Sequence, residues 1–472
     1  MAQTFFFYDL ETSGLNARED RIMQFAGRRT SMDLAPIGEP YNMLVALSDD
    51  TLPNPDALMV TGITPQKTVD EGYSEVQFAR ILNDEIFTPD TIVVGFNNVR
   101  FDDEFIRHLL WRNFYDPYEW CWKDGRSRWD MLDVVRMTRA LRPEGISWPL
   151  DDAGEPTNRL ELITRENDIA HKNAHDAMSD VDALIDVTKL IRDKQPQLFE
   201  YLLKMRDKKE VVKLVNVDDK KPFVYSSGRY DKEFAKTTAA FPLSAGRNGN
   251  VVVYDLRYDP TLFIDLSESE LAHKVYASWQ ERQAEDFVKL PAKELQPNRC
   301  PAVAPLGVLA HGGGWAKILL DAETIAKHQK ILLAHPEFAE KLRTIFENKP
   351  EFTRSPDPEA QLYDGFLNDR DRLRAEAVRN ASERELADFH PNFADERLPG
   401  LLLHYKARNF PKTLSSDERE MWQTWRAARI QAQLPKYMAA LQRFAASALD
   451  PGKEFIVQEL QLWAESILPE PD

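Results

Sequence analysis

The sequence predicts an α/β domain with a mixed sheet, then a smaller β-rich domain, then a helix-rich third domain. Three observations support this. First, the N-terminal part contains apolar runs of strand length, with helical periodicity interleaved later. Second, the middle part contains short strand-like runs separated by turns. Third, the chain ends in charged helical stretches. With 472 residues the chain exceeds one compact core, since domains usually hold about 100–200 residues.

The first domain is predicted to span residues 4–190 and to close near Gln195-Pro196. Buried strands are expected at Thr4–Leu10, Arg21–Thr30, Tyr41–Leu47 and Thr91–Phe96, where apolar and aromatic residues form short runs. Helices are expected at Val76–Phe87, Asp103–Phe114, Trp129–Leu141, Arg159–Glu166 and Asp176–Asp193. Strands first and helices interleaved later are typical of a mixed sheet with helical cover.

The second domain is predicted at residues 196–350 and the third at 352–472. Glu210–Val217, Pro222–Tyr225 and Asn250–Leu256 are predicted strands of the β-rich domain. In the third domain the clearest predicted helices are Asp417–Leu434 and Lys436–Leu449. Pro435 lies between them and is expected to break or kink the helix, because proline lacks the backbone N–H that a helix needs.

Composition limits the class of protein. A formal net charge of -17 argues against a protein that grips nucleic acid over its whole surface, but it leaves room for a local basic groove. Cys121 and Cys300 are too few for a disulfide framework or a Cys-rich zinc site, so we expect two reduced thiols. The N-terminus lacks the basic region of a signal peptide, and no stretch approaches the roughly 20 apolar residues of a membrane span. We therefore expect a soluble, cytoplasmic protein.

Two carboxylates lie at the end of the first predicted strand. Asp9 and Glu11 are two residues apart, so they point to the same face of a strand while Leu10 points to the packed face. Like charges side by side repel unless a cation neutralises them, and Mg²⁺ prefers such oxygen ligands. By itself the D-x-E triplet is also common at a solvated strand end.

Two further polar elements follow along the chain. A buried strand runs into Asn97-Asn98-Val99-Arg100-Phe101-Asp102, and a loop-like stretch precedes His175-Asp176-Ala177-Met178-Ser179-Asp180. Acids that begin a helix, such as Asp103 and Glu104, are explained equally well by the helix dipole. A lone histidine is often only a capping residue. His175 is five residues from Asp180, which is about 140° of rotation on a helix, so the two converge more easily if His175 precedes the helix.

Taken together, the three elements resemble the DEDDh family of 3′→5′ exonucleases. The matching positions are Asp9, Glu11, Asp102, Asp180 and His175. The resemblance implies an RNase H-like exonuclease fold over roughly residues 4–190. It also implies a two-metal mechanism, in which Mg²⁺, or Mn²⁺ in its place, is bound by the four acids, and His175 takes a proton from the attacking water.

Longer segments resemble the bacterial exonuclease I family over essentially the whole chain. They are Asn97–Asp103, Arg112–Tyr118, Leu141–Ile146, Ala174–Met178 and Tyr405–Pro411. The resemblance implies an SH3-like middle domain, a helical third domain and a monomeric enzyme. It further implies processive digestion of single-stranded DNA to 5′-mononucleotides, in DNA repair and recombination.

Residues 107–142 are rich in arginine and aromatic residues, a combination that suits phosphate contacts and base stacking. Each of these residues is explained equally well as core or as ordinary surface. From the resemblance we expect Arg107, Tyr118, Trp122 and Arg136 to contact the strand and Arg159 to contact DNA near the active site. The resemblance also implies that Glu11 touches the terminal nucleotide.

The family resemblance also implies a protein partner. Members dock the acidic C-terminal tail of single-strand-binding protein, and Arg142 is the candidate contact here. Two alternatives stay open at this point. One is the same chemistry on another substrate, as in an exoribonuclease or a proofreading subunit, although such proteins are usually shorter. The other is a non-catalytic single-strand-binding protein, against which the five catalytic-type positions argue.

Overall fold

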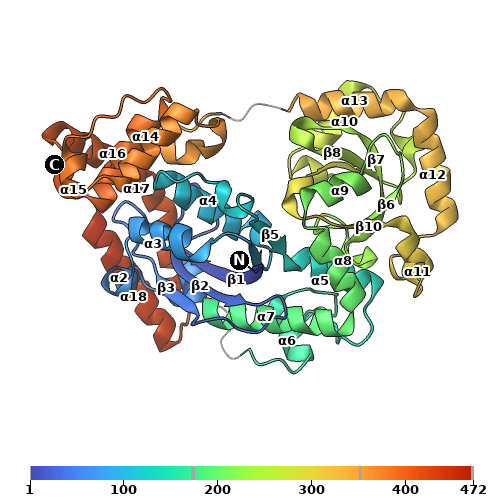
Figure 1. The fold of residues 1–472 in the computed structure, drawn as a ribbon, viewed down its shortest axis with the longest axis horizontal. Coiled ribbons are helices and arrows are strands. Elements are labelled where there is room, and N and C mark those ends of the chain that lie inside the picture. The colour runs from blue at the N-terminus through green and yellow to red at the C-terminus, as the bar shows by residue number, and fades with distance from the viewer. Residues whose placement is uncertain (1, 172–175, 350–352, 469–472) are drawn as a thin grey trace. The chain divides into compact units, whose positions relative to one another are not determined.

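The computed structural model describes residues 2–171, 176–349 and 353–468. The chain forms two compact units, and each is made of segments that are distant in sequence. The first comprises residues 1–127, 171–182 and 353–472, and the second comprises residues 128–170 and 183–352. The first unit therefore joins the N-terminal strands to the C-terminal helices, which are blue and orange to red in Figure 1.

The first unit is built on a mixed sheet. Its strands are β1 (Thr4–Thr12), β2 (Ile22–Thr30), β3 (Tyr41–Leu44) and β4 (Thr91–Gly95). The sheet order is β3-β2-β1-β4-β5, and β5 (Ser127–Asp130) begins at the last residue of the N-terminal segment and continues in the second unit. The strand β1 pairs antiparallel with β2 and parallel with β4, which confirms the predicted mixed sheet. The helices α1 (Pro55–Thr61), α2 (Pro65–Glu71), α3 (Glu75–Ile81), α4 (Asp102–Arg112) and the start of α7 (Ala177–Lys194) accompany it.

Alternation along β1 decides on which face of the sheet each side chain lies. Phe6, Tyr8 and Leu10 enter one hydrophobic cluster with side chains of α3 and α4. The intervening positions, which include Asp9 and Glu11, therefore point to the other face. The two acids lie on the face opposite Leu10, as the sequence pattern predicts, and they share that face with Phe5 and Phe7, which are fully buried.

The C-terminal helices complete the first unit. They are α14 (Asp369–Asn380), α15 (Glu383–Ala387), α16 (Arg397–Asn409), α17 (Ser416–Ala445) and α18 (Pro451–Ile467). One hydrophobic cluster joins Met23 and Leu58 to Ile430 of α17 and Leu460 of α18. Burying large apolar side chains of this kind stabilises a fold by about 1.5–3 kcal/mol each. The C-terminal helices thus share a core with the N-terminal sheet.

A buried ionic cluster reinforces this junction. Glu359 has no exposed surface and accepts from Arg21 at 2.9 Å and from His404 at 2.8 Å, and it also pairs with Arg408 at 2.5 Å. Arg408 reaches Asp50 as well, at 2.8 Å. Burial alone would raise the pKa of Glu359, but the charges of Arg408 and Arg21 hold it well below its usual range. Breaking such a pair is costly because it leaves an uncompensated buried charge.

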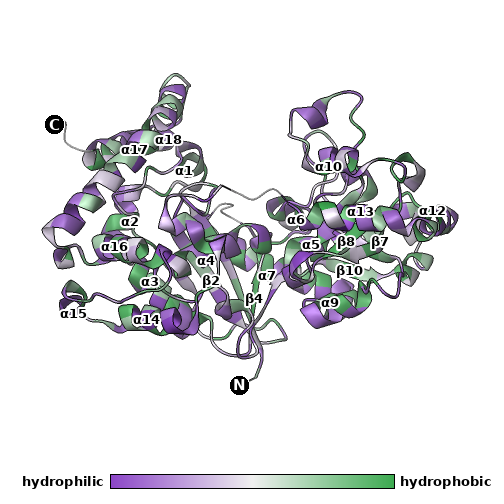
Figure 2. Cartoon of the chain, turned by 90° about the horizontal axis from the view of Figure 1, so that it is seen from above, coloured by the Kyte–Doolittle hydropathy of each residue, from purple (hydrophilic) through white to green (hydrophobic). Residues whose placement is uncertain are grey.

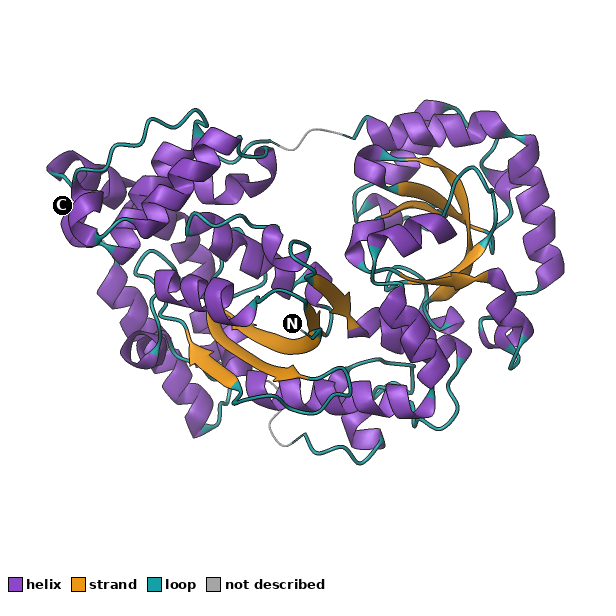
Figure 3. Ribbon diagram, in the orientation of Figure 1, coloured by secondary structure: helices purple, strands orange, loops and turns teal. Residues whose placement is uncertain are grey.

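The second unit contains an antiparallel sheet. Its strands are β6 (Phe223–Ser226), β7 (Thr237–Ala245), β8 (Val251–Asp255), β9 (Ala292–Leu295) and β10 (Ala302–Pro305), in the order β10-β6-β7-β8-β9. These strands, orange in Figure 3, curve around an interior, and Figure 2 colours them mainly as hydrophobic. The α-helices of this unit are α5 (Met131–Leu141), α6 (Leu160–Glu166), the remainder of α7, α8 (Pro196–Lys204), α9 (Lys208–Leu214), α10 (Glu268–Tyr276), α11 (Gly314–Lys317), α12 (Ala322–Ala334) and α13 (Pro336–Glu347).

One predicted strand is wrong. The stretch Glu210–Val217 is not a strand, because residues 208–214 form helix α9, capped by the Asp207 side chain and buried through Val211. Of the two outcomes expected at Pro435, a break or a kink, the break does not occur, because α17 continues through the proline. The packing of Ile430 and Tyr437, on either side of the proline, in the cluster shared with α18 offsets the lost hydrogen bond. None of the described helices combines the length and apolar character that a membrane crossing requires.

Candidate active site

The strand β1 positions the first two acids. Asp9 lies opposite Ala26 and Glu11 opposite Gln24 in the antiparallel pairing with β2. Both carboxylates are partly exposed, whereas Leu10 between them is buried. The pairing shifts by one residue directly after Glu11. Such a bulge ends regular pairing and is common next to active sites.

A tight turn positions the third acid. The strand β4 ends at Gly95, where an added Cβ would lie 2.5 Å from the Cβ of Asn98, so only glycine allows this approach. Asn97 has a φ of 68°, in the left-handed region that asparagine tolerates best among residues with a side chain. The turn delivers Asp102 as the first residue of α4, where it is only 4% exposed.

The fourth acid comes from the start of α7. Asp180 lies in the first turn of this helix. One carboxylate oxygen each from Asp9, Glu11 and Asp180 lies within 4.8 Å of the others, which is close enough to bind one cation. Asp102 is near enough for its charge to act on both Asp9 and Glu11. The structure therefore brings together all four predicted acids.

The electrostatics of this group favour a bound cation. Burial, followed by the charges of Asp102, Asp180 and Glu11, raises the pKa of Asp9 well above its usual range. Burial and the charges of Asp180, Asp102 and Asp176 raise the pKa of Glu11 to about 8. Two such charges 4.8 Å apart repel by about 3 kcal/mol at an effective dielectric constant of about 20. A divalent cation would reverse the sign of these interactions, and carboxylate oxygens are the donors that hard cations prefer.

The predicted histidine and an unpredicted one lie close together in sequence. His175 lies outside the described residues. His171 was missed, and its Nε2 lies 2.5 Å from Oδ1 of Asp180, with the ring almost fully buried. Its position before the helix, the argument used for His175, was the one signal that would have identified it.

A second group of possible cation ligands has a different character. Asp357, Glu359 and His404 also bring ligand atoms within 4.8 Å of one another. Glu359 is already paired with Arg21 and Arg408, so positive charge surrounds it. We assign this group to the ionic cluster between the N-terminal sheet and the C-terminal helices, because arginines already neutralise its carboxylates.

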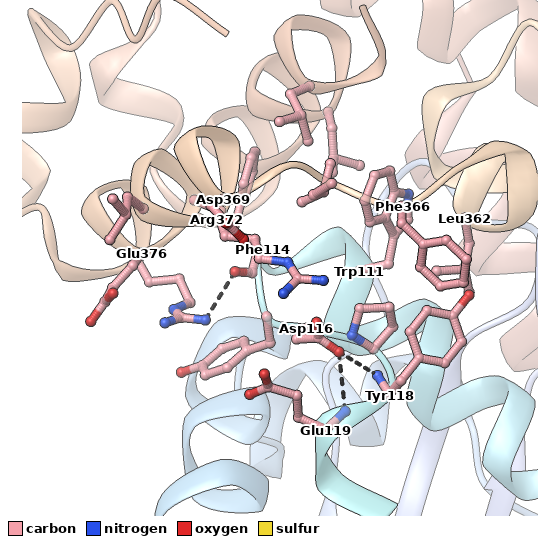
Figure 4. Close-up of a pocket in the computed structure, with 18 of the residues that line it drawn as sticks. Trp111, Phe114, Asp116, Tyr118, Glu119, Leu362, Phe366, Asp369, Arg372 and Glu376 are labelled. Atoms are coloured by element: carbon pink, nitrogen blue, oxygen red, sulfur yellow. Dashed lines mark hydrogen bonds between the residues drawn. The ribbon is translucent and has the colours of Figure 1, made fainter. Parts of the chain in front are cut away.

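Two of the predicted strand contacts lie close together on and after α4. Arg107 is 7% exposed, its Nη1 donates to Glu104 Oε1 at 2.9 Å, and its guanidinium lies 5.5 Å from the centre of the Tyr118 ring. Tyr118 also lines a pocket of about 400 Å³ between residues 111–123 and residues 362–401 of the same unit (Figure 4). Phe366, 80% exposed, also lines the pocket, and its ring centre lies 5.7 Å from that of Tyr118. These rings present aromatic surface of the kind that bases stack on.

The other predicted contacts differ in their surroundings. The Trp122 ring is 63% exposed, although a large aromatic side chain usually finds a packing partner. In the second unit, Arg136 donates to Asp133 Oδ1 at 2.6 Å, and Arg159 pairs with Glu161 while most of its side chain stays exposed. Arg142 is half-buried at the end of α5 and donates to the Leu141 carbonyl at 2.6 Å.

Several other arginines and rings of residues 107–142 have structural roles. Arg112 is buried against Glu75, with Nη2 and Oε1 2.6 Å apart, and Arg128 Nη2 donates to the Asn298 carbonyl at 2.8 Å. The Trp120 and Trp129 rings are at most 5% exposed. Residues 107–142 therefore include both core residues and exposed rings, and the sequence was compatible with either environment for each of them.

Family profiles and relatives of known function match nearly the whole chain. Residues 6–188 match the family profile described as Exonuclease, residues 206–348 the Exonuclease I SH3-like domain, and residues 356–467 the Exonuclease I C-terminal domain. The chain is 39% identical to exodeoxyribonuclease I of Haemophilus influenzae over 442 residues, or 93% of each chain. It is 37% identical to the Escherichia coli exodeoxyribonuclease I over 473 residues, or 98% of each. The chain belongs to the exodeoxyribonuclease I family.

Solved structures of the exodeoxyribonuclease I family have the same fold. Exonuclease I of Methylocaldum szegediense superposes with a TM-score of 0.94 at 37% identity, over 99% of this chain and 100% of that one. The E. coli exonuclease I complex with a dA16 oligonucleotide gives 0.93 at 37% identity, with the same coverage. A zinc-bound E. coli complex with single-stranded DNA gives 0.92 at 36% identity, and an SSB/exonuclease I structure with the inhibitor CFAM gives 0.89 at 35%, each again over 99% and 100%.

Proposed function

We propose that this member of the exodeoxyribonuclease I family is a single-strand-specific 3′→5′ exodeoxyribonuclease that releases 5′-mononucleotides processively, in DNA repair and recombination. The observation that carries the proposal is the convergence of four acids from three elements, with raised pKa values at Asp9 and Glu11. Such a group neither packs a core nor stabilises a fold, so the repulsion between its carboxylates is explained by function. Family membership supports DNA as the substrate.

Divalent cations are the expected cofactor. The donor set consists of carboxylates, and a relative has been solved with zinc and single-stranded DNA. We propose two Mg²⁺ ions, with Mn²⁺ able to substitute, which Asp9, Glu11, Asp102 and Asp180 would hold. Two bound ions would lower the pKa of the attacking water and neutralise charge on the phosphate and the leaving oxygen.

The protein residues supply positioning and proton transfer. We propose that His175 takes the proton from the attacking water, because the reference pKa of a histidine side chain, about 6.5, suits a general base near neutral pH. Glu11 and Arg159 would hold the terminal nucleotide. Arg107 and Arg136 would bind phosphates, and Tyr118 and Trp122 would stack on bases, which tolerates any sequence. The exposed rings of Trp122 and Phe366 support this path.

A protein partner is proposed for the second unit. The guanidinium of Arg142 would receive the acidic C-terminal tail of single-strand-binding protein, and the solved SSB/exonuclease I structure of the family supports such a partner. Arg142→Ala should lose binding to a tail peptide in a fluorescence anisotropy titration. Unchanged binding would remove Arg142 from this role. The domain boundaries at 190, 196, 350 and 352, the monomeric state and the cytoplasmic location stay predictions.

The central experiment is a gel assay on end-labelled single strands. With Mg²⁺ the wild type should shorten a 5′-labelled DNA strand from its 3′ end and should leave a matched RNA strand intact, and a chelator should stop it. Asp180→Ala should abolish cleavage while leaving binding of the strand largely intact. Asp182→Ala is the matched control, because Asp182 lies two residues after Asp180 on α7 and pairs with Arg28 at 3.0 Å. Equal digestion by wild type and Asp180→Ala would refute the assignment.

A further inference from the structure

Behind the four acids lies a buried hydrogen-bonded group made of Tyr8, Asn98 and Asp103. The Tyr8 hydroxyl donates to Asp103 Oδ1 at 2.7 Å, and Asn98 Nδ2 donates to the same oxygen at 3.1 Å. All three side chains are at most 1% exposed. Burial and the charges of Asp103 and Asp102 raise the pKa of Tyr8, so its hydroxyl remains a proton donor.

The three residues lie directly beside the proposed metal ligands. Tyr8 precedes Asp9 on β1, and adjacent strand residues point to opposite faces of the sheet. Asp103 follows Asp102 on α4, and adjacent helical residues point about 100° apart. The group is therefore on the core side of β1 and α4, while Asp9 and Asp102 carry the metal-binding side. Its hydrogen bonds join two elements that are 95 residues apart in sequence.

The turn before α4 holds Asn98 in place. Asn98 is packed over Gly95, where any Cβ would collide with it, and the left-handed residue Asn97 precedes it. A helix-dipole role for Asp103 does not account for this arrangement, because its Oδ1 receives donors from a neighbouring strand and from the turn. The geometry is that of a brace between β1, the turn and α4.

We propose that Asp103, with its donors Tyr8 and Asn98, is a positioning residue that holds Asp9 and Asp102 at cation-binding separation. The four acids repel one another, so β1 and α4 must be held together before a cation arrives. Partners that orient metal ligands from behind usually change metal affinity about 10–100-fold when they are removed. The inference rests on the proposed function, because it assumes that Asp9 and Asp102 bind divalent cations.

The test measures cation binding rather than activity. Mn²⁺ is titrated into metal-free wild-type protein and into Tyr8→Phe by calorimetry. Tyr8→Phe removes one hydroxyl, and we expect Mn²⁺ to bind about 10-fold more weakly. The matched control is Tyr437→Phe, which deletes another buried hydroxyl, bonded to the Leu460 carbonyl at 2.7 Å, in the C-terminal helices. The control should bind Mn²⁺ like the wild type.

A second pair of variants separates positioning from folding. Asp103→Asn keeps an oxygen acceptor for Tyr8 and Asn98, whereas Asp103→Ala removes it, so Asn should retain much of the Mn²⁺ affinity that Ala loses. If Tyr8→Phe does not fold, as judged by circular dichroism, Asn98→Ala replaces it with the same expectation. Single-strand binding in the presence of chelator should be the same in every folded variant.

The outcomes distinguish this inference from the proposed function. If the wild type neither binds Mn²⁺ nor cleaves DNA, the proposed function fails and the brace has no metal ligands to position. If the wild type does both and Tyr8→Phe and Asp103→Ala bind Mn²⁺ as tightly, the positioning role alone is overturned. Equal losses of Mn²⁺ affinity in Tyr8→Phe and Tyr437→Phe would also overturn it. Tyr437 is bonded within the C-terminal helices, so an equal loss there would reflect a general effect on stability.

Discussion

Replacing Glu11 by glutamine should make the metal-free protein more stable while it damages the metal site. Glu11 is held near Asp180, Asp102 and Asp176, whose charges together with burial raise its pKa from 4.5 to about 8. Below about pH 4.5 Glu11 is protonated in both the folded and the unfolded chain. Between pH 4.5 and 8 the unfolded chain releases this proton and the folded protein retains it, so folding stability falls as pH rises. Glutamine has no charge to lose, so the variant escapes this loss.

The structure sets the size of the effect. A rise in pKa from 4.5 to about 8 corresponds to about 5 kcal/mol, because one pKa unit is about 1.4 kcal/mol. The carboxylate is partly exposed, and solvent screening reduces this figure, so we expect about 2 kcal/mol at pH 8. For a domain of about 150–250 residues that is roughly 5 °C in the melting temperature.

The assay is a thermal melt of wild type and Glu11→Gln at pH 5 and at pH 8, with chelator and with Mg²⁺. With chelator the variant should melt higher than the wild type at pH 8, and the two should nearly coincide at pH 5. With Mg²⁺ the advantage should shrink or reverse, because the wild type gains binding energy that the variant lacks. A variant that melts lower than the wild type at pH 8 in chelator would refute the electrostatic reasoning.

Three further predictions follow from the remaining contacts. Arg107→Ala should weaken binding of single-stranded DNA. The slope of log K against the logarithm of the salt concentration, measured by anisotropy, should become shallower by about 1, and an unchanged slope would exclude a phosphate contact. Phe366→Ala should weaken the same binding by about 1–3 kcal/mol if a base stacks beside Tyr118, and equal affinity would exclude stacking there. Glu359→Ala should cost about 3–5 kcal/mol in urea unfolding at pH 7. Because the pKa of Glu359 is depressed, its contribution is present above about pH 4.5 and lost on acidification, so the wild type and the variant should converge at low pH.

Much of the fold was predictable because the signals are local. The strand β1 follows from an apolar run that ends in polar residues, and β4 and the helix α5 follow from similar patterns. The sheet of the second unit was only partly predictable. The strand β7 (Thr237–Ala245) is built from small and polar residues such as Thr237 and Ala239, whose burial comes from partners distant in sequence. The helix α9 was mistaken for a strand because its valines suit both structures, and tertiary packing decides between them.

The acids of the site were predictable, whereas their supports were not. Asp9 and Glu11 follow from strand alternation and Asp102 from the turn before a helix. Sequence alone gave Asp103 the role of a helix-start acid, since nothing in a linear pattern shows that the Tyr8 hydroxyl, 95 residues away, donates to it. The contact of His171 with Asp180 was hidden for the same reason, because a linear pattern does not show which side chains meet in space.

The central claim is that four carboxylates from three elements bind divalent cations for hydrolysis of a DNA strand. The most direct measurement is anomalous diffraction from a crystal of this protein soaked in Mn²⁺. We predict anomalous peaks within about 2.0–2.6 Å of oxygens of Asp9, Glu11, Asp102 and Asp180, the range of hard-cation bonds to oxygen. A well-ordered soaked crystal with no peak among these four side chains, or with peaks only elsewhere, would contradict the account.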